Sequence, residues 1–207
     1  MRRVWVGGLG ALVVVLFAAG CGSGSSDVPT PTTGPAAPET TGSSAPAGTG
    51  RTYDAVGLDL CARTDLGPLA DLSLTVERRE PKQPRSAPGA ACLFEMRTRS
   101  GHQASLLVEA STLGSADEAG RLYRATQDVS EMNPDGAVDG VGDEAEAFAQ
   151  QSEPGFRYAE YMIHTRSGNL VLKVWLAVGG TAFTPKDVLA AKVETIVKAT
   201  LSQVPES

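Results

Sequence analysis

A long stretch of small and polar residues limits which part of this chain can fold. Residues 22–50 consist of Gly, Ser, Pro, Thr and Ala, with Asp27, Val28 and Glu39 as the only exceptions. Such a segment carries too little apolar surface to offset the entropy lost on ordering, so we expect residues 21–50 to form a disordered tether. A core must therefore come from residues 51–205, which are enough for one domain.

The segment ahead of the tether has the features of an export signal. Arg2 and Arg3 precede an uncharged, mostly apolar run from Val4 to Ala19. This run is shorter than the ~20 residues that a membrane-spanning helix needs, and three glycines in its first half weaken it further as a helix. A basic start, an apolar core and small residues at the end predict a secretory signal peptide over residues 1–20. A retained transmembrane anchor is the alternative.

The end of that segment resembles the bacterial lipobox, in which small residues and an apolar run precede a cysteine. The residues run Leu16-Phe17-Ala18-Ala19-Gly20-Cys21, and they depart from the usual pattern at Ala18, where Leu is common. The resemblance implies cleavage between Gly20 and Cys21, a diacylglycerol on the Cys21 thiol and acylation, for example by palmitate, of the new amino terminus. Two or more acyl chains hold a protein durably, so we expect a lipid-anchored chain at the extracytoplasmic face of the cell membrane. An ordinary signal followed by a free thiol is the alternative.

The charge of the chain argues against one class of partner. The formal net charge is −6, and loss of Arg2 and Arg3 with the signal makes the chain more acidic. An acidic protein repels phosphate backbones, so we expect no nucleic-acid partner.

Two cysteines, Cys61 and Cys92, remain after Cys21. An even pair outside the cytoplasm favours a structural disulfide. A thiolate metal site would need further ligands, and the only histidines, His102 and His164, show no clustered spacing. A redox pair would prefer the Cys-x-x-Cys spacing.

Hydrophobic periodicity predicts helices and hairpins in alternation. We expect a short kinked helix within 58–72, a strand over 74–79 and a proline-rich loop over 80–89. Two hairpins follow, 91–97 with 103–110 and 156–165 with 169–178, and the turns are Arg99-Ser100-Gly101 and Arg166-Ser167-Gly168.

Two more helices are indicated by capping patterns. Ser115 and Glu118 form a capping box ahead of a helix that ends before Asn133, and Thr184 with Pro185 starts the last helix. Its apolar face is Leu189, Val193, Ile196, Val197 and Leu201. The order indicates an α+β fold: an antiparallel sheet built from hairpins, with helices packed on one face and one disulfide.

Several of these features occur together in one protein family. The lipobox, the Ser/Pro/Thr tether, Cys61 before a first helix, Cys92-Leu93-Phe94 and Gly140-Val141-Gly142-Asp143-Glu144-Ala145 resemble actinobacterial lipoproteins with a two-cysteine domain of unassigned function. They are also similar to the extracellular sensor domains of mycobacterial Ser/Thr kinases. The resemblance covers most of residues 55–202 and implies a disulfide-pinned sheet with packed helices, without a reaction. In that family Trp is common where this chain has Phe94.

Glycines and acidic residues cluster around position 140, where they could serve a nucleotide or a metal ion. Gly140-x-Gly142-x-x-Ala145 echoes a dinucleotide fingerprint, which requires a preceding strand and a following helix. Asn133-Pro134-Asp135-Gly136 predicts a turn there instead, so we expect glycines that permit positive φ before a strand. Asp135, Asp139, Asp143 and Glu144 lack the spacing of a calcium-binding loop, and we expect solvated acidic residues and no metal.

Catalytic patterns are weak elsewhere. Glu144 and Glu146 would share one face of a strand, but glycoside hydrolysis needs two carboxyls across a cleft. His164 is expected to be structural, and no Gly-x-Ser-x-Gly elbow is present. We therefore expect no enzyme activity and no cofactor.

Aromatic residues gather on the second hairpin, namely Phe156, Tyr158, Tyr161 and Trp175. Core packing is the expected role, and an apolar groove is the alternative. The preferred function is a non-catalytic binding or interaction module of the cell envelope, whose partner is a wall component, an envelope lipid or a protein. An envelope lipid or glycolipid carrier and a hydrolase are the alternatives.

Overall fold

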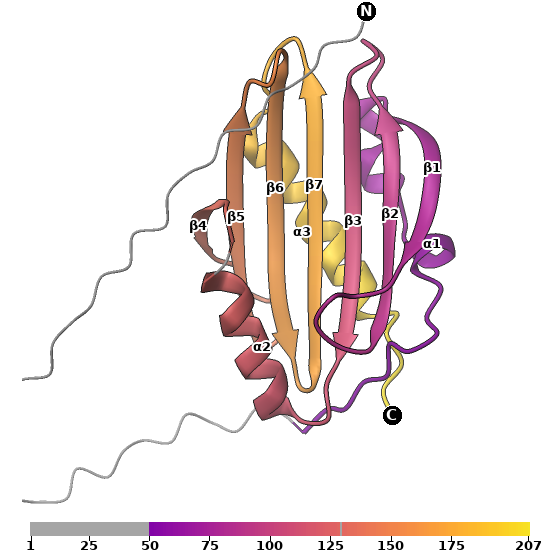
Figure 1. The fold of residues 1–207 in the computed structure, drawn as a ribbon, viewed down its shortest axis with the longest axis vertical. Coiled ribbons are helices and arrows are strands. Elements are labelled where there is room, and N and C mark those ends of the chain that lie inside the picture. The colour runs from indigo at the N-terminus through magenta and orange to yellow at the C-terminus, as the bar shows by residue number, and fades with distance from the viewer. Residues whose placement is uncertain (1–49, 129) are drawn as a thin grey trace, which may run out of the picture. The chain divides into compact units, whose positions relative to one another are not determined.

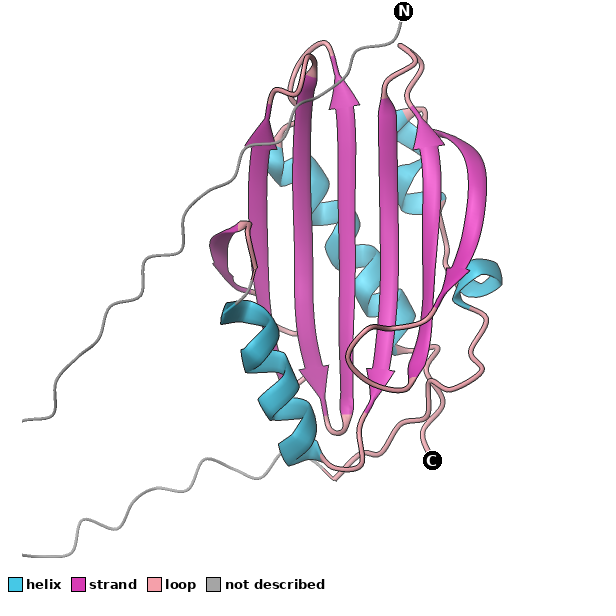
Figure 2. Ribbon diagram, viewed as in Figure 1, coloured by secondary structure: helices cyan, strands magenta, loops and turns pink. Residues whose placement is uncertain are grey.

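A computed structural model describes residues 50–128 and 130–207. The predicted signal peptide, the lipidation at Cys21 and the tether up to residue 49 lie outside the described residues. The elements are α1 (Leu60–Arg63), the 3-10 helix η1 (Gly67–Leu72), β1 (Thr75–Lys82), β2 (Gly89–Arg97), β3 (Gln103–Thr112), α2 (Ala116–Asp128), β4 (Asn133–Ala137), β5 (Glu144–Ser152), β6 (Arg157–Ser167), β7 (Leu170–Gly180) and α3 (Lys186–Leu201). Figures 1 and 2 show one broad sheet with helices against it.

The sheet has seven strands in the order β1-β2-β3-β7-β6-β5-β4, and every neighbouring pair is antiparallel. The chain therefore builds two meanders, β1–β3 and β4–β7, which join where β7 pairs with β3. The α+β fold with an antiparallel sheet is confirmed.

The core lies between the sheet and α3. Alternate residues of β2, β3, β6 and β7 point to this side, and in β7 they are Leu170, Leu172, Val174, Leu176 and Val178. They meet the predicted apolar face of α3, where Leu189, Val193, Ile196 and Val197 are almost completely buried. Side chains fill this layer, because period two in the strands and period 3.6 in the helix both direct apolar residues inward.

Both predicted hairpins are confirmed, with longer strands than expected. β1 continues through Glu80 and Pro81 to Lys82, where a loop was predicted, because proline is tolerated on an edge strand. The second hairpin turns at Gly168-Asn169, so β6 includes the Arg166 and Ser167 that were expected in the turn.

A third hairpin, β4–β5, was not predicted. Asn133-Pro134-Asp135-Gly136 reads as a turn but forms the edge strand β4, with a register shift between Pro134 and Gly136. An edge position leaves the missing amide of Pro134 without consequence. Gly140 and Gly142 do have positive φ, as expected, in the loop before β5.

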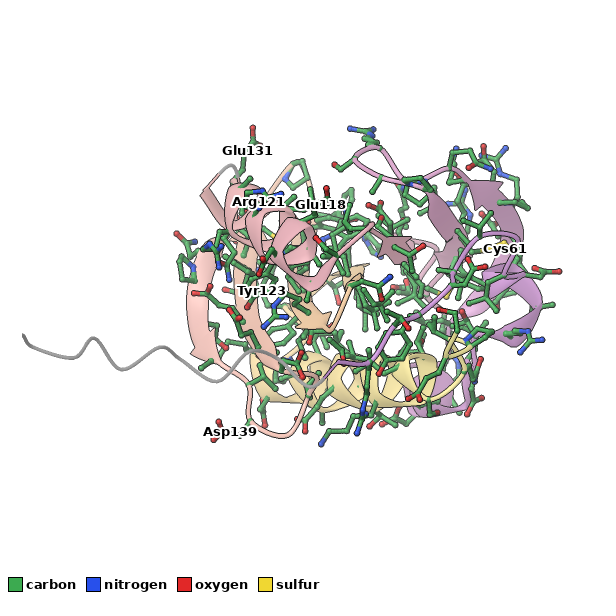
Figure 3. The ribbon with its side chains drawn as sticks, turned by 90° about the horizontal axis from the view of Figure 1, so that it is seen from below. Cys61, Glu118, Arg121, Tyr123, Glu131 and Asp139 are labelled. Atoms are coloured by element: carbon green, nitrogen blue, oxygen red, sulfur yellow. A yellow bond between two sulfur atoms is a disulfide. The ribbon has the colours of Figure 1, made fainter. Side chains whose placement is uncertain are left out.

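The helices divide between the two faces of the sheet. α1, η1 and α3 cover one face, whereas α2 lies against the opposite face (Figure 3), so the prediction that the helices pack on one face is wrong for α2. The reason is that side chains alternate along β7. Val171 points away from the α3 side, and Ala119 and Tyr123 of α2 pack on it.

The helix starts were predicted in part. The Ser115 hydroxyl accepts a hydrogen bond from the Glu118 amide at 3.2 Å, as in a capping box. The Glu118 carboxylate reaches back to the Gly114 amide at 2.9 Å, one residue earlier than in the standard pattern. Thr184 does not cap α3, because the helix begins at Lys186 with Pro185 in the N-cap position and no side-chain cap.

The first described residues are joined to the end of the domain. Tyr53 forms a β-bridge with Glu206. The Asn169 side chain also binds the backbone of Tyr53: its oxygen accepts a hydrogen bond from the Tyr53 amide at 2.7 Å, and its nitrogen donates one to the Tyr53 carbonyl at 3.1 Å. Gly168 lies under this segment with φ +52°, and a Cβ there would come within 2.0 Å of the Arg51 carbonyl oxygen. The two ends of the domain therefore meet at the β6–β7 turn.

Candidate functional site

The face of the sheet opposite α3, called here the open face, is the candidate site. α2 contacts β6 and β7 on this side and crosses only one corner of the sheet in Figure 1. Antiparallel sheets commonly leave one face to solvent, and that face is then polar. The centre of the open face differs, because apolar side chains lie there.

Four apolar side chains cross the open face in one line, called here the apolar row. They are Leu93, Leu107, Trp175 and Met162, which are register partners on β2, β3, β7 and β6. Each is half-buried, and adjacent strands ~4.8 Å apart give the row a length of about 14 Å. Phe148 continues the line on β5 but is 2% exposed.

Ion pairs border the apolar row on two sides. Arg78 donates to both carboxylate oxygens of Glu95, at 2.9 and 2.7 Å, and this guanidinium holds the pKa of Glu95 below its ordinary value. Lys173 lies 3.2 Å from Glu109. The carboxylates of Glu95 and Glu109 are therefore each neutralised by a cation of the same chain.

Glu160 is different from the other carboxylates beside the row. Its Oε2 accepts a hydrogen bond from the indole Nε1 of Trp175 at 3.0 Å. Burial raises the pKa of Glu160, and the bond from Trp175 opposes that shift. Tyr158, one position further along the same side of β6, has a pKa raised to about 12, first by burial and then by the charge of Glu160.

The corner under α2 is built around His164. His164 is 3% exposed, and its ring stacks on Tyr123 with 5.0 Å between ring centroids, while the Thr126 hydroxyl lies 3.3 Å from Nδ1 of the ring. Burial, followed by the charge of Lys173, lowers the pKa of His164 to about 4. His164 is structural, as expected, and is sealed between helix and sheet.

A second polar cluster centres on the Arg166 guanidinium. Arg166 donates to Glu144 Oε1 at 3.1 and 2.6 Å and to Asp143 Oδ2 at 3.4 Å. The same Asp143 oxygen accepts from the Gly168 amide at 2.8 Å. Asp143 and Glu144 were expected to be solvated, but they hold the β4–β5 loop onto the β6–β7 turn.

The other two calcium candidates lie apart from this cluster. Asp135 accepts a hydrogen bond from the Tyr161 hydroxyl at 3.2 Å and pairs with Lys186. Asp139 points outward from the β4–β5 loop (Figure 3). Across residues 50–128 and 130–207, no three His, Cys, Asp or Glu side chains are placed to hold a metal ion.

Glu144 and Glu146 share one face of β5, as predicted, and both line a cleft of about 540 Å³ between α2 and the β4–β5 loop. Each already has a partner, Arg166 for Glu144 and the Gln127 amide for Glu146. The pair therefore serves to join α2 and the loop to the sheet.

The predicted aromatic cluster is split by the sheet. Tyr161 faces the core, where packing was expected. Trp175 and Tyr158 lie on the open face, and the Phe156 ring packs edge-on against Tyr158, 5.9 Å between centroids. His102 also contacts Phe156 and is hydrogen-bonded to Ser100. It is therefore not near His164.

The predicted disulfide between Cys61 and Cys92 is present and joins α1 to β2. No helix among the described residues is long and apolar enough to span a membrane.

The sequence did not identify Leu93, Leu107, Met162 and Glu160 as residues of a candidate site. A signal for the first three exists, because Ala90–Phe94, Leu106–Val108 and Tyr161–Ile163 are continuous apolar runs. Such runs indicate strands with apolar residues on both faces. Glu160 carries no comparable signal, because its partner Trp175 comes from another strand.

Comparison with protein-family models, with curated proteins and with solved structures finds no match to this chain.

Proposed function

We propose that this chain is an exported lipoprotein, anchored through Cys21, whose domain is a non-catalytic binding module of the cell envelope. The apolar row is the observation that carries the proposal. Large apolar side chains in line on an otherwise polar sheet face are typical of an interaction surface, and Trp and Met are enriched in protein interfaces.

The Cys61–Cys92 disulfide supports the extracytoplasmic part of the proposal. Disulfides persist in oxidising compartments and are rare in the cytosol, and here the bond joins a buried cysteine of the sheet to α1. Export followed by retention on a lipid anchor accounts for both the signal and the bond.

The two alternatives have less support. A lipid carrier needs an apolar cavity between sheet and helix, whereas Leu172, Val174, Val193 and Val197 are completely buried there. A hydrolase needs an accessible base, whereas His164 is sealed and Glu144 is engaged by Arg166.

The anchor predicts a simple change in location. In the Cys21→Ser variant no thioether can form, so we expect the protein to leave the membrane fraction and to run at a different mass on intact-protein mass spectrometry. Cys61→Ala with Cys92→Ala is the matched control, because it also removes cysteine side chains but leaves Cys21. Full membrane retention of Cys21→Ser at unchanged mass would refute the anchor.

The binding surface is tested by photocrosslinking in intact cells. With p-benzoylphenylalanine at Leu107, we expect a discrete crosslinked adduct whose partner is identified by mass spectrometry. The same residue at Ala191, exposed on the outer side of α3, is the control and should give none. Equal crosslinking from both positions, or none from Leu107 in folded protein, would contradict a binding role for the open face.

A further inference from the structure

One carboxylate oxygen beside the apolar row has no partner. Glu160 Oε2 accepts from Trp175, and no hydrogen bond reaches Oε1 from the described residues. Every fully buried side-chain N or O atom of those residues has a partner, so Oε1 must be open to solvent. Glu160 stands two residues from Met162 along β6, and Trp175 is the register partner of Met162 on the neighbouring strand.

Glu160 also lacks a cation. Glu95 is paired with Arg78, and Glu109 with Lys173, but no ion pair to Glu160 forms within the described part of the chain. Burial raises the pKa of Glu160, and a partly buried carboxylate without a neighbouring cation is unfavourable. Next to the apolar row, the open face therefore holds a carboxylate that no cation of the described residues compensates.

The apolar row lines none of five hollows on the described domain. Glu160 borders one of them, a hollow of about 350 Å³ that Gln150 and Leu189 also line. Sites for small molecules are concave, whereas flat surfaces with a central Trp are typical of protein partners.

We propose that the apolar row and Glu160 together dock a segment of a partner protein in which a lysine or arginine is flanked by apolar side chains. The apolar side chains contact the row, and the cation reaches Oε1 of Glu160 beside the Trp175 indole. This inference rests on the proposed function, since it names the partner of the same surface. A neutral glycan would contact the row without depending on the charge of Glu160.

The test is a selection from random 12-residue peptides on the full chain in a nonionic detergent. We expect the recovered peptides to carry Lys or Arg next to apolar residues. Binding is then measured through the fluorescence of Trp175, the only tryptophan outside the predicted signal peptide. Glu160→Gln, or Lys→Gln in the peptide, should each weaken binding about tenfold, because a hydrogen bond to a charged group is lost. The two changes together should weaken binding no more than either change alone, because both remove the same contact.

Two further variants separate the possible failures. Glu194→Gln, a carboxylate on α3 paired with Lys198, should bind like wild type, and Leu107→Glu should abolish binding. Peptides without basic residues, or binding unchanged in Glu160→Gln, would overturn the inference while leaving the open face as a binding surface. Binding unaffected by Leu107→Glu would overturn the site itself. Recovery of no peptide, with binding of chitooligosaccharides instead, would replace the protein partner by a glycan.

Discussion

Replacing Cys61 and Cys92 with alanine should lower the free energy of unfolding by about 3–4 kcal/mol. The disulfide spans 31 residues, and opening it returns the entropy of that loop to the unfolded chain. α1 has only four residues and cannot hold itself against the sheet, so we expect the region before β1 to lose order first. Equilibrium urea unfolding with a two-state fit measures the change.

Reduction of the wild-type protein is the matched control, because it opens the same loop and keeps both side chains. Cys92 is completely buried, so the alanine variant also loses packing around its sulfur. Reduced wild type should therefore lie between the oxidised protein and the double variant. A loss below about 1 kcal/mol on reduction would mean that the unfolded chain is already constrained in this region.

Acidification from pH 6.5 to pH 4 should remove about 3 kcal/mol of stability through His164. The pKa of His164 is about 4 in the folded protein and 6.5 ordinarily, so between these values the unfolded state binds more protons. Stability from this group is complete above pH 6.5 and is lost as the pH falls towards 4. The physical reason is that a charged imidazole cannot be solvated between Tyr123 and the sheet.

The measurement is the slope of unfolding free energy against pH. Carboxylates contribute to the slope in the same range, so the difference between wild type and His164→Gln isolates the histidine. His102→Gln is the matched control, since His102 lies at the other end of the sheet and does not contact α2, and it should keep the wild-type slope. An identical slope in His164→Gln would show that His164 titrates normally and that α2 packs more loosely than described.

Several parts of the fold could be predicted because their signals are local. The alternation of Leu106, Val108 and Ala110 marks β3, and Ser115 with Glu118 marks the start of α2. The disulfide could be predicted from cysteine count and compartment. Predictions failed where a local preference was overridden, as at Asn133–Gly136, where a turn sequence became an edge strand.

The candidate site could not be predicted in the same way. The aromatic residues were expected in the core, yet parity along β6 and β7 directs Tyr161 inward and Tyr158 and Trp175 outward. Knowing that Trp175 points outward does not predict which residues lie next to it on the sheet. Leu93 and Met162 lie 82 and 13 residues away in the chain, by sequence number, and meet Trp175 in one row only through strand pairing.

The sequence by itself determined most of the strands and helices, and the apolar side of β3 and α3, because backbone periodicity and capping depend on residues a few positions apart. Tertiary structure alone decided that β7 pairs with β3, that α2 lies on the face opposite α3, and that Glu160 stands beside Trp175 with no cation from residues 50–128 and 130–207. These outcomes depend on strand order and register, which follow from burying one shared core and leave no mark on any single segment.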